Sequence, residues 1–187
     1  MRRIVYSVAM SLDGYVAGPN GEADWIVVDP EIDFAGMMAR FDTVLMGRRT
    51  FEAVRQQGGG GSMPGVASVV VSRTLRSEDL PGVMVIGEDV GGGVARLRGR
   101  PGKDIWLFGG GLLFRSLLDL GLVDTVEVAV VPVLLGGGVP LLPARSRRSS
   151  LRLAGSRTFQ ATGTVSLEYT VVREAAESDR ELSRDAS

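Results

Sequence analysis

The stretch IWLFGGGLLFRSLLDLGL at residues 105–122 places three glycines between an apolar run and a segment with helical spacing. The pattern predicts a buried strand at 104–109 and a helix that Gly121 ends. Free amides at the start of such a helix can bind an anion such as a phosphate, because the helix dipole points its positive end there. A plain tight turn between strand and helix explains the same glycines equally well.

Two further strand ends carry polar side chains. In VLMGRRTFE (44–52) a buried strand ends and a helix begins, and in VVVSRT (69–74) another buried strand ends. In open α/β sheets, ligands bind outside the carboxyl ends of the strands. The residues at these two ends that could meet a phosphate are Gly47, Arg48, Arg49, Thr50, Ser72, Arg73 and Thr74. Together with the glycine turn, they favour a ligand that carries several phosphates.

Three other glycine runs, at 58–61, 91–93 and 136–138, lack this context. None has a strand before it and a helix after it in the sequence pattern, and the chain contains no GxGxxG fingerprint. We interpret 58–61 as a loop, 91–93 as part of a weakly patterned segment, and 136–138 as a connection between strands.

The remaining pattern predicts an α/β fold. We expect strands at 2–10, 43–47, 66–72 and 83–87, with helices from Pro30 to about residue 41 and at 48–57. After Asp124, strand-like runs at 125–135, 150–160 and 164–172 follow with little helix between them, the last two as a hairpin across 161–163. This order predicts a mixed, mostly parallel central sheet with an antiparallel C-terminal edge. One domain should span 1–173, followed by a polar, frayed tail at 174–187.

Composition excludes several classes of function. With 187 residues and a formal net charge of -1, the chain offers no electrostatic basis for binding nucleic acid or an anionic membrane. No apolar run approaches about 18 residues, so we expect a cytoplasmic protein. The absence of cysteine and histidine excludes thiol nucleophiles, Ser-His-Asp triads and the usual zinc ligands. Chemistry would therefore depend on carboxylates, other polar groups or a bound cofactor.

Five motifs, in order along the chain, resemble those of one family. They are VAMSLDGYVAGPNGEADW (8–25), DTVLMGRRTFE (42–52), VVVSRT (69–74), LFGGGLLFRSLL (107–118) and GLVDTVEVAVVPVLLGGGVPLL (121–142). The chain resembles the dihydrofolate reductase fold and, more closely, stand-alone relatives of the reductase domain of bifunctional riboflavin-biosynthesis deaminase-reductases. The resemblance covers residues 2–173 and implies a three-layer fold with helices on both faces of the sheet.

The resemblance also implies NADPH as the hydride donor. Residues 47–50 match the family segment at the cofactor phosphates, and 72–74 match the contact to the adenosine 2'-phosphate. The segment along the pyrophosphate and nicotinamide ribose corresponds to Phe108, Gly109, Gly110, Gly111, Leu112 and Leu113. Ala9 and the loop 16–21, beginning at Val16, match the part that covers the nicotinamide.

Three carboxylates, Asp13, Asp29 and Glu31, are candidates for the catalytic or substrate-binding group. Dihydrofolate reductases place one carboxylate early in the first helix, and counting back from Gly47 puts that position at Glu31, with Asp29 and Asp33 as neighbours. Ordinary charge at a helix start explains these residues equally well. Asp13 lies near the expected nicotinamide position, where an Asp-Gly turn is the alternative.

The implied reaction is hydride transfer to a C=N or C=O group of a small heterocycle, of the riboflavin-pathway type (5-amino-6-(5-phosphoribosylamino)uracil reductase-like) or pterin-like (dihydrofolate reductase-like). The alternative is a non-catalytic module on the same fold that binds a nucleotide or a flavin. The resemblance further implies a homodimer formed through the apolar strand after Asp124, although burial within one subunit explains that strand as well. No metal, nucleic acid or membrane partner is expected.

Overall fold

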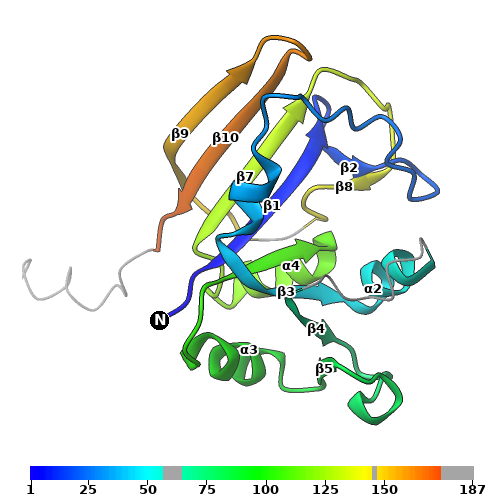
Figure 1. The fold of residues 1–187 in the computed structure, drawn as a ribbon, viewed down its shortest axis with the longest axis vertical. Helices are drawn as coiled ribbons and strands as arrows, with labels where there is room; N and C mark the ends of the chain where they lie inside the picture. Colours follow the sequence, from blue (N-terminus) through cyan, green and yellow to red (C-terminus); the bar gives the residue numbers. More distant parts are fainter. Residues whose placement is uncertain (57–64, 145–146, 174–187) are drawn as a thin grey trace, which may run out of the picture.

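The computed structural model describes residues 1–56, 65–144 and 147–173. Two sequence predictions, the loop over 58–61 and the frayed tail at 174–187, lie outside the described residues. Figure 1 shows a central twisted sheet with helices packed against it. None of the helices in the described ranges has the length and apolar character needed to cross a membrane.

The sheet has eight strands in the order β5-β4-β3-β6-β1-β7-β10-β9. The strands are β1 (Ile4–Ser11), β3 (Phe41–Gly47), β4 (Ala67–Val71), β5 (Val83–Ile86), β6 (Asp104–Gly109), β7 (Thr125–Val131), β9 (Leu151–Phe159) and β10 (Thr164–Val171). The first six in this order pair in parallel, and β10 and β9 continue the sheet antiparallel. The predicted mixed sheet with an antiparallel C-terminal edge is confirmed.

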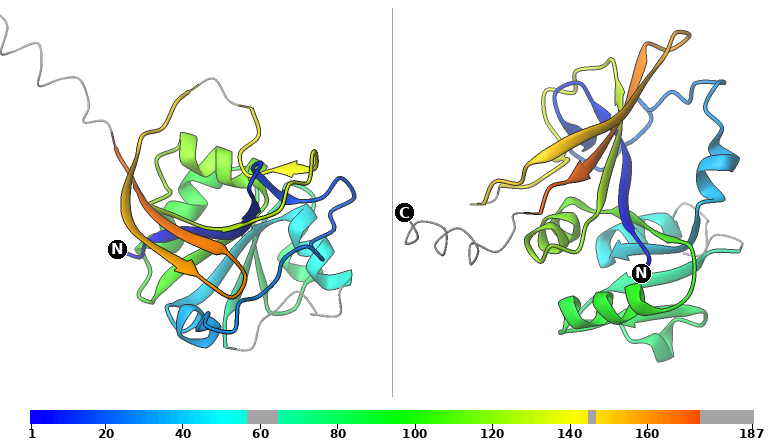
Figure 2. Two further views of the ribbon diagram at one scale, coloured as in Figure 1. Left: turned by 90° about the horizontal axis from the view of Figure 1, so that it is seen from above. Right: turned by 90° about the vertical axis from the view of Figure 1, so that its left-hand side faces the viewer.

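Helices cover both faces of the parallel part. They are α1 (Phe34–Met38), α2 (Arg48–Val54), α3 (Val90–Gly99) and α4 (Gly111–Asp119), with a 3-10 turn η2 at Ser77–Asp79. A short pair of strands, β2 (Tyr15–Ala17) and β8 (Val139–Pro140), lies beside the main sheet. Figure 2 shows α1 and α4 on opposite sides of the sheet, as the three-layer prediction requires.

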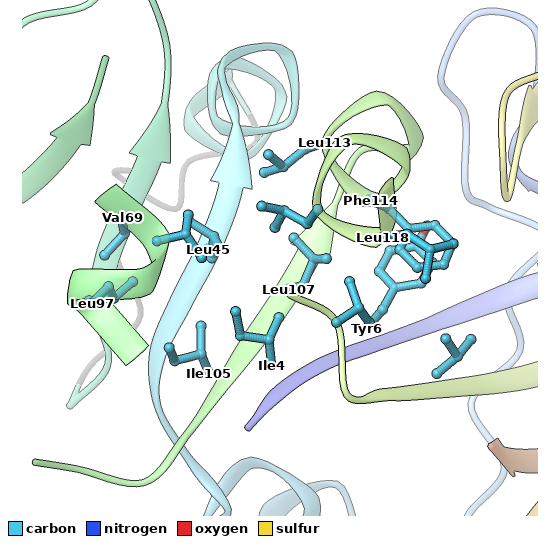
Figure 3. Close-up of a cluster of buried hydrophobic side chains, with 14 of the residues drawn as sticks. Ile4, Tyr6, Leu45, Val69, Leu97, Ile105, Leu107, Leu113, Phe114 and Leu118 are labelled. Atoms are coloured by element: carbon cyan, nitrogen blue, oxygen red, sulfur yellow. The ribbon is translucent and has the colours of Figure 1, made fainter. Parts of the chain in front are cut away.

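Two hydrophobic cores form because the parallel strands are apolar on both faces. One core packs strand residues such as Leu45 and Leu107 against α3 and α4, and the ring of Tyr6 stacks on Phe114 with centroids 3.8 Å apart (Figure 3). The other core lies under α1 and α2 and includes Phe51 and Trp106. Each fully buried large side chain contributes roughly 1.5–3 kcal/mol to folding.

The end of α4 follows the sequence prediction closely. Gly121 has a φ of 66°, and its amide donates to the carbonyl of Leu118 at 3.1 Å, while the amide of Leu122 donates to Leu117 at 2.9 Å. This pair of bonds is a Schellman motif, which satisfies the last carbonyls of the helix. The predicted C-terminal hairpin is also confirmed, because β9 and β10 pair across residues 160–163.

Two predicted elements are shorter than expected. The first helix begins at Phe34 and not near Pro30, because the Asp33 side chain caps it by accepting the amide of Gly36 at 2.8 Å. The strand predicted at 125–135 ends at Val131, since Pro132 has no amide to donate to a neighbouring strand.

One helix is absent from the sequence prediction. The glycine run at 91–93 lies in the first turns of α3, although glycine costs about 1 kcal/mol relative to alanine in a helix. Asp89 caps this helix by accepting the amide of Gly92 at 2.8 Å. A Cβ on Gly93 would lie 2.6 Å from Ile86, so glycine allows α3 to pack directly on β5. The tertiary contact therefore overrides the local preference.

Polar contacts tie the strands together at the amino ends of the parallel strands. The buried guanidinium of Arg2 donates to the carbonyl of Lys103 at 2.5 Å and to the hydroxyl of Thr43 at 2.6 Å, and it pairs with Asp42. Burial opposes ionisation of Asp42, but the Lys103 amide, the Thr43 hydroxyl and the Arg2 charge together hold its pKa below the usual range. This end of the sheet is thus closed by internal partners.

Candidate functional site

A cleft with a volume of about 1280 Å³ opens at the carboxyl ends of the parallel strands. All fifteen residues that the sequence assigns to a cofactor line it: Ala9, Val16, Gly47, Arg48, Arg49, Thr50, Ser72, Arg73, Thr74, Phe108, Gly109, Gly110, Gly111, Leu112 and Leu113. They come from segments up to about a hundred residues apart in sequence. The strand order brings them together because β4, β3, β6 and β1 are successive neighbours that run in the same direction.

The glycine turn after β6 lies against the junction after β3. A Cβ on Gly110 would lie 3.3 Å from the hydroxyl oxygen of Thr50, and one on Gly47 would lie 3.9 Å from the amide nitrogen of Gly110. Gly111 faces the other way, where a Cβ would lie 2.8 Å from Pro143. A side chain at position 111 would clash with Pro143, so close packing of the turn requires glycine there whether or not the turn binds a ligand.

Arginines give one half of the cleft a positive charge. Arg48, Arg49 and Arg73 are all exposed beside the strand ends. Arg48 makes a long contact of 3.7 Å with Glu52 one turn further along α2, which is a weak surface pair. Within the described ranges, no hydrogen bond or ion pair engages the guanidinium of Arg49 or Arg73. We call this region, from β3 and β4 to the start of α4, the cationic half.

Ser72 shapes the loop that presents Arg73. Its hydroxyl oxygen is buried and accepts the amides of Thr74 at 3.2 Å and Leu75 at 3.0 Å. Side-chain bonds of this kind fix a turn directly after a strand. The turn leaves the Arg73 side chain exposed to solvent at the edge of the cleft.

The three predicted catalytic carboxylates lie outside the residues that line the cleft. Asp13 accepts the Ser11 hydroxyl at 2.6 Å and the amides of Leu135 at 3.1 Å and Gly136 at 2.7 Å. The Ser11 hydrogen bond first, and the two amides after it, hold the pKa of Asp13 below its usual range. Asp13 thus joins the loop after β1 to the loop after β7.

Asp29 and Glu31 also have partners elsewhere. Asp29 is fully buried and accepts the amide of Glu31 at 2.9 Å, together with the amide and hydroxyl of Thr162 at 3.1 and 2.9 Å. Glu31 is exposed and pairs with Arg157 at 3.3 Å. The geometry gives all three carboxylates partners that hold loops or the β9–β10 hairpin, and a catalytic role for them stays a prediction.

A different set of residues lines the other half of the cleft, and of its charged members sequence reasoning named only Asp33, as a neighbour of Glu31. Its charged members are Asp33, Arg40, Glu127, Arg157 and Glu168. Strand register places Ser7, Glu127 and Glu168 in one row across β1, β7 and β10, and Ala9, Ala129, Ser166 and Arg157 in the next row. We call this region the substrate half. In each of the segments VEVAVV and SLEYTV the glutamate is a single charged residue in an apolar strand, and this pattern could have marked Glu127 and Glu168 as candidate site residues.

The mixed sheet and the cleft at the ends of its parallel strands define the dihydrofolate reductase-like class of α/β proteins. The chain belongs to the RibD C-terminal domain family, whose model matches residues 2–165. This match confirms the resemblance to the reductases of the riboflavin pathway, and it places the chain in a reductase family.

Relatives and solved structures agree with this assignment. The chain is 35% identical over 179 residues to the uncharacterized protein YyaP of Bacillus subtilis, covering 90% of this chain and 94% of YyaP. It is also 30% identical to the uncharacterized protein YwjB of the same organism, covering 84% of this chain and 92% of YwjB. A crystal structure from Shewanella sp. PV-4, named for riboflavin biosynthesis, is 28% identical with a TM-score of 0.77, covering 92% of this chain and 100% of that chain.

Two more distant structures share the fold. The diaminohydroxyphosphoribosylaminopyrimidine deaminase/5-amino-6-(5-phosphoribosylamino)uracil reductase of Thermotoga maritima has a TM-score of 0.67 at 17% identity, covering 91% of this chain and 57% of that chain. A pyrimidine reductase-like protein of Corynebacterium diphtheriae has a TM-score of 0.63 at 18% identity, covering 92% and 93% of the two chains.

Proposed function

We propose that this chain is an NADPH-dependent reductase that transfers a hydride to a C=N or C=O group of a small heterocyclic substrate. The observation that carries the proposal is the single cleft lined by all fifteen predicted cofactor residues. Membership of a riboflavin-type reductase family supports the same reaction class.

The cationic half has the groups that a phosphate-rich dinucleotide needs. Arg73 would hold the adenosine 2'-phosphate, and Arg48 and Arg49 would hold the other phosphates, because guanidinium groups bind phosphate oxygens in pairs. The narrow space between Gly110 and Thr50 would be filled by any larger side chain, so the glycine keeps the start of α4 open to a pyrophosphate. NADPH, when bound, supplies the hydride, a chemistry that no side chain provides.

The chain's own contribution is to bind, orient and exclude water. Ala9 and Val16 lie where the resemblance places the nicotinamide cover, and Phe108 adds an apolar wall packed edge-on against Trp106 at 4.8 Å between centroids. Holding two reactants in a dry, ordered pocket lowers the barrier mainly through orientation and proximity.

A non-catalytic nucleotide or flavin module is the alternative on the same fold. Such a module needs the cationic half but has no use for a pocket beside the nicotinamide. The cleft continues past Ala9 to Glu127 and Glu168, and this extension supports a reductase over a module.

The proposal is tested by comparing NADPH and NADH binding to the protein and to an Arg73→Ala variant by titration calorimetry. Loss of a charge-assisted contact should weaken NADPH roughly 10- to 100-fold, while NADH, which lacks the 2'-phosphate, should change little. Arg76→Ala removes an exposed arginine three residues away that does not line the cleft, and it should alter neither affinity. Equal losses for the two cofactors in Arg73→Ala would contradict the assignment.

We also propose that the protein forms a homodimer, as the resemblance implies. The strand after Asp124, to which the resemblance assigns the contact, is β7, and both of its edges are occupied by β1 and β10 of the same subunit, so a contact through that strand is not supported. The contact proposed here is the edge strand β9 instead, where Leu151 and Leu153 are 44% and 55% exposed. Exposed apolar side chains on an edge strand are a common site of association between chains.

A further inference from the structure

The two central strands β1 and β6 separate where they reach the cleft. Their parallel pairing ends at Tyr6 and Leu107. Beyond these residues β1 remains paired with β7 as far as Ser11, and β6 remains paired with β3 as far as Gly109. Because β1 and β6 are neighbours in the sheet, this end of their pairing opens the sheet between them.

The cleft extends into this opening. The lining residues that the two strands supply here include Ser7, Val8 and Ala9 from β1 and Trp106, Phe108 and Gly109 from β6. We call the opening between 7–9 of β1 and 108–109 of β6 the strand gap. Ala9 is the residue that the resemblance places against the nicotinamide, so the strand gap is where the proposed function puts the reacting ring of the cofactor.

The separation of the strands leaves one backbone carbonyl of β1 without a partner in the sheet. Carbonyls along this strand point alternately to its two neighbours. That of Arg3 accepts the amide of Ile105 on β6 at 2.8 Å, and that of Ile4 accepts the amide of Asp124, next to β7, at 3.0 Å. By this alternation the carbonyl of Ser7 points toward β6, beyond the last paired residues. A half-buried carbonyl in this position needs a donor from elsewhere.

The side chain of Trp106 supplies that donor. Its indole Nε1–H donates to the carbonyl of Ser7 at 2.9 Å. The ring is only 5% exposed, and it packs edge-on against Phe108 and stacks on Phe41, with centroids 4.8 and 5.9 Å apart. One side chain of β6 therefore bonds to β1 across the opening and also supports a wall residue of the strand gap. A leucine would fill the same space without satisfying the carbonyl.

From this geometry we infer that Trp106 is a positioning residue that fixes the width of the strand gap for the reacting end of the cofactor. It acts through Ser7, which leads directly to Ala9, and through Phe108 on the opposite side. The inference rests on the proposed reductase function, and it divides the binding of NADPH between two sets of residues. The arginines of the cationic half hold the phosphates, whereas Trp106 sets the orientation of the ring on which hydride transfer depends.

The test compares two ligands in a Trp106→Phe variant, which keeps an aromatic ring and loses the indole N–H. The ligands are NADPH and adenosine 2',5'-bisphosphate, which carries the 2'-phosphate but no nicotinamide. Loss of one hydrogen bond at the strand gap should weaken NADPH roughly 3- to 10-fold in titration calorimetry and leave the bisphosphate unchanged. Unchanged bisphosphate binding also shows that the variant is folded.

Phe41→Leu is the matched control. Phe41 is buried in the same core as Trp106 and does not line the cleft, so its replacement reduces core packing and leaves the indole hydrogen bond in place. The ratio of the two affinities should not change in this variant. Incorporation of 3-benzothienylalanine at position 106, which replaces the N–H by sulfur in a ring of the same shape, should reproduce the selective loss if the phenylalanine variant does not fold.

Hydrogen exchange of the ligand-free proteins measures the same role without a cofactor. In Trp106→Phe we expect faster exchange confined to 7–11 and 107–110, because the bond across the strand gap is lost, and no such selective change in Phe41→Leu. Unchanged exchange in these segments, an undiminished NADPH affinity or equal losses for the two ligands would overturn the inference. Failure of the unmodified protein to bind NADPH would reject the reductase, and the exchange rates would then decide by themselves whether Trp106 holds the strand gap.

Discussion

Asp29 shows how the setting of a single residue changes its interpretation. Its position before the first helix makes it a candidate catalytic carboxylate by resemblance. In the folded chain it is fully buried and accepts three hydrogen bonds, one from Glu31 and two from Thr162 in the β9–β10 turn. Asp29 therefore holds the hairpin to the segment before α1.

Asp29→Asn should destabilise the protein with little effect on cofactor binding. The amide would place an NH₂ group against donors, and leaving buried donors unsatisfied costs about 1–3 kcal/mol. Chemical denaturation should show this loss in the free energy of unfolding. Glu31→Gln, at an exposed pair, should change stability by less than about 1 kcal/mol. A fully stable Asp29→Asn protein that has lost catalysis would instead favour the catalytic role.

Residues of the cationic half were predictable from sequence, and most residues of the substrate half were not. Arg48, Arg73 and Gly110 each follow a strand within a few residues, so local pattern was enough to place them at the same sheet edge. Glu127 and Glu168 lie in the middle of strands whose register depends on long-range pairing. Sequence spacing could not show that these glutamates face each other.

At the scale of elements, α3 shows where local preference fails. Three successive glycines weaken a helix, so the local pattern did not predict one at 90–99. The packing of Gly93 on Ile86 and the Asp89 cap supply the missing stability. By contrast, α4 and the strands β3, β4 and β6 have strong local patterns, and they were predicted to within a few residues.

Alanine substitutions within α3 should have opposite effects. A Cβ on Gly93 would lie 2.6 Å from Ile86, and overpacking of this kind typically costs 1–3 kcal/mol. A Cβ on Gly91 would make ordinary contact with Leu120 at 3.6 Å, so Gly91→Ala should stabilise the helix by about 0.5–1 kcal/mol. Thermal denaturation should therefore place Gly93→Ala below Gly91→Ala. Equal or greater stability of Gly93→Ala would show that close packing at Gly93 is unimportant.

At the scale of the whole molecule, the order of motifs determined what could be predicted. Parallel strands followed by antiparallel strands specify the mixed sheet, whereas the order of the strands within it comes from the structure. The amino ends of the parallel strands are tied by Arg2 and Asp42, while the carboxyl ends open into the cleft. The fold thus separates a closed stabilising end from an open binding end.

The assignment of the cationic half to the phosphates of NADPH is the central claim, and the identity of the bound cofactor tests it most directly. Titration calorimetry of the unmodified protein with NADPH, NADH and FMN makes the comparison under one set of conditions. We predict that NADPH binds at least about tenfold more tightly than NADH, since Arg73 gains a charged partner, and that FMN binds more weakly than either. Binding of FMN in preference to NADPH, or equal affinities for NADPH and NADH, would contradict the account.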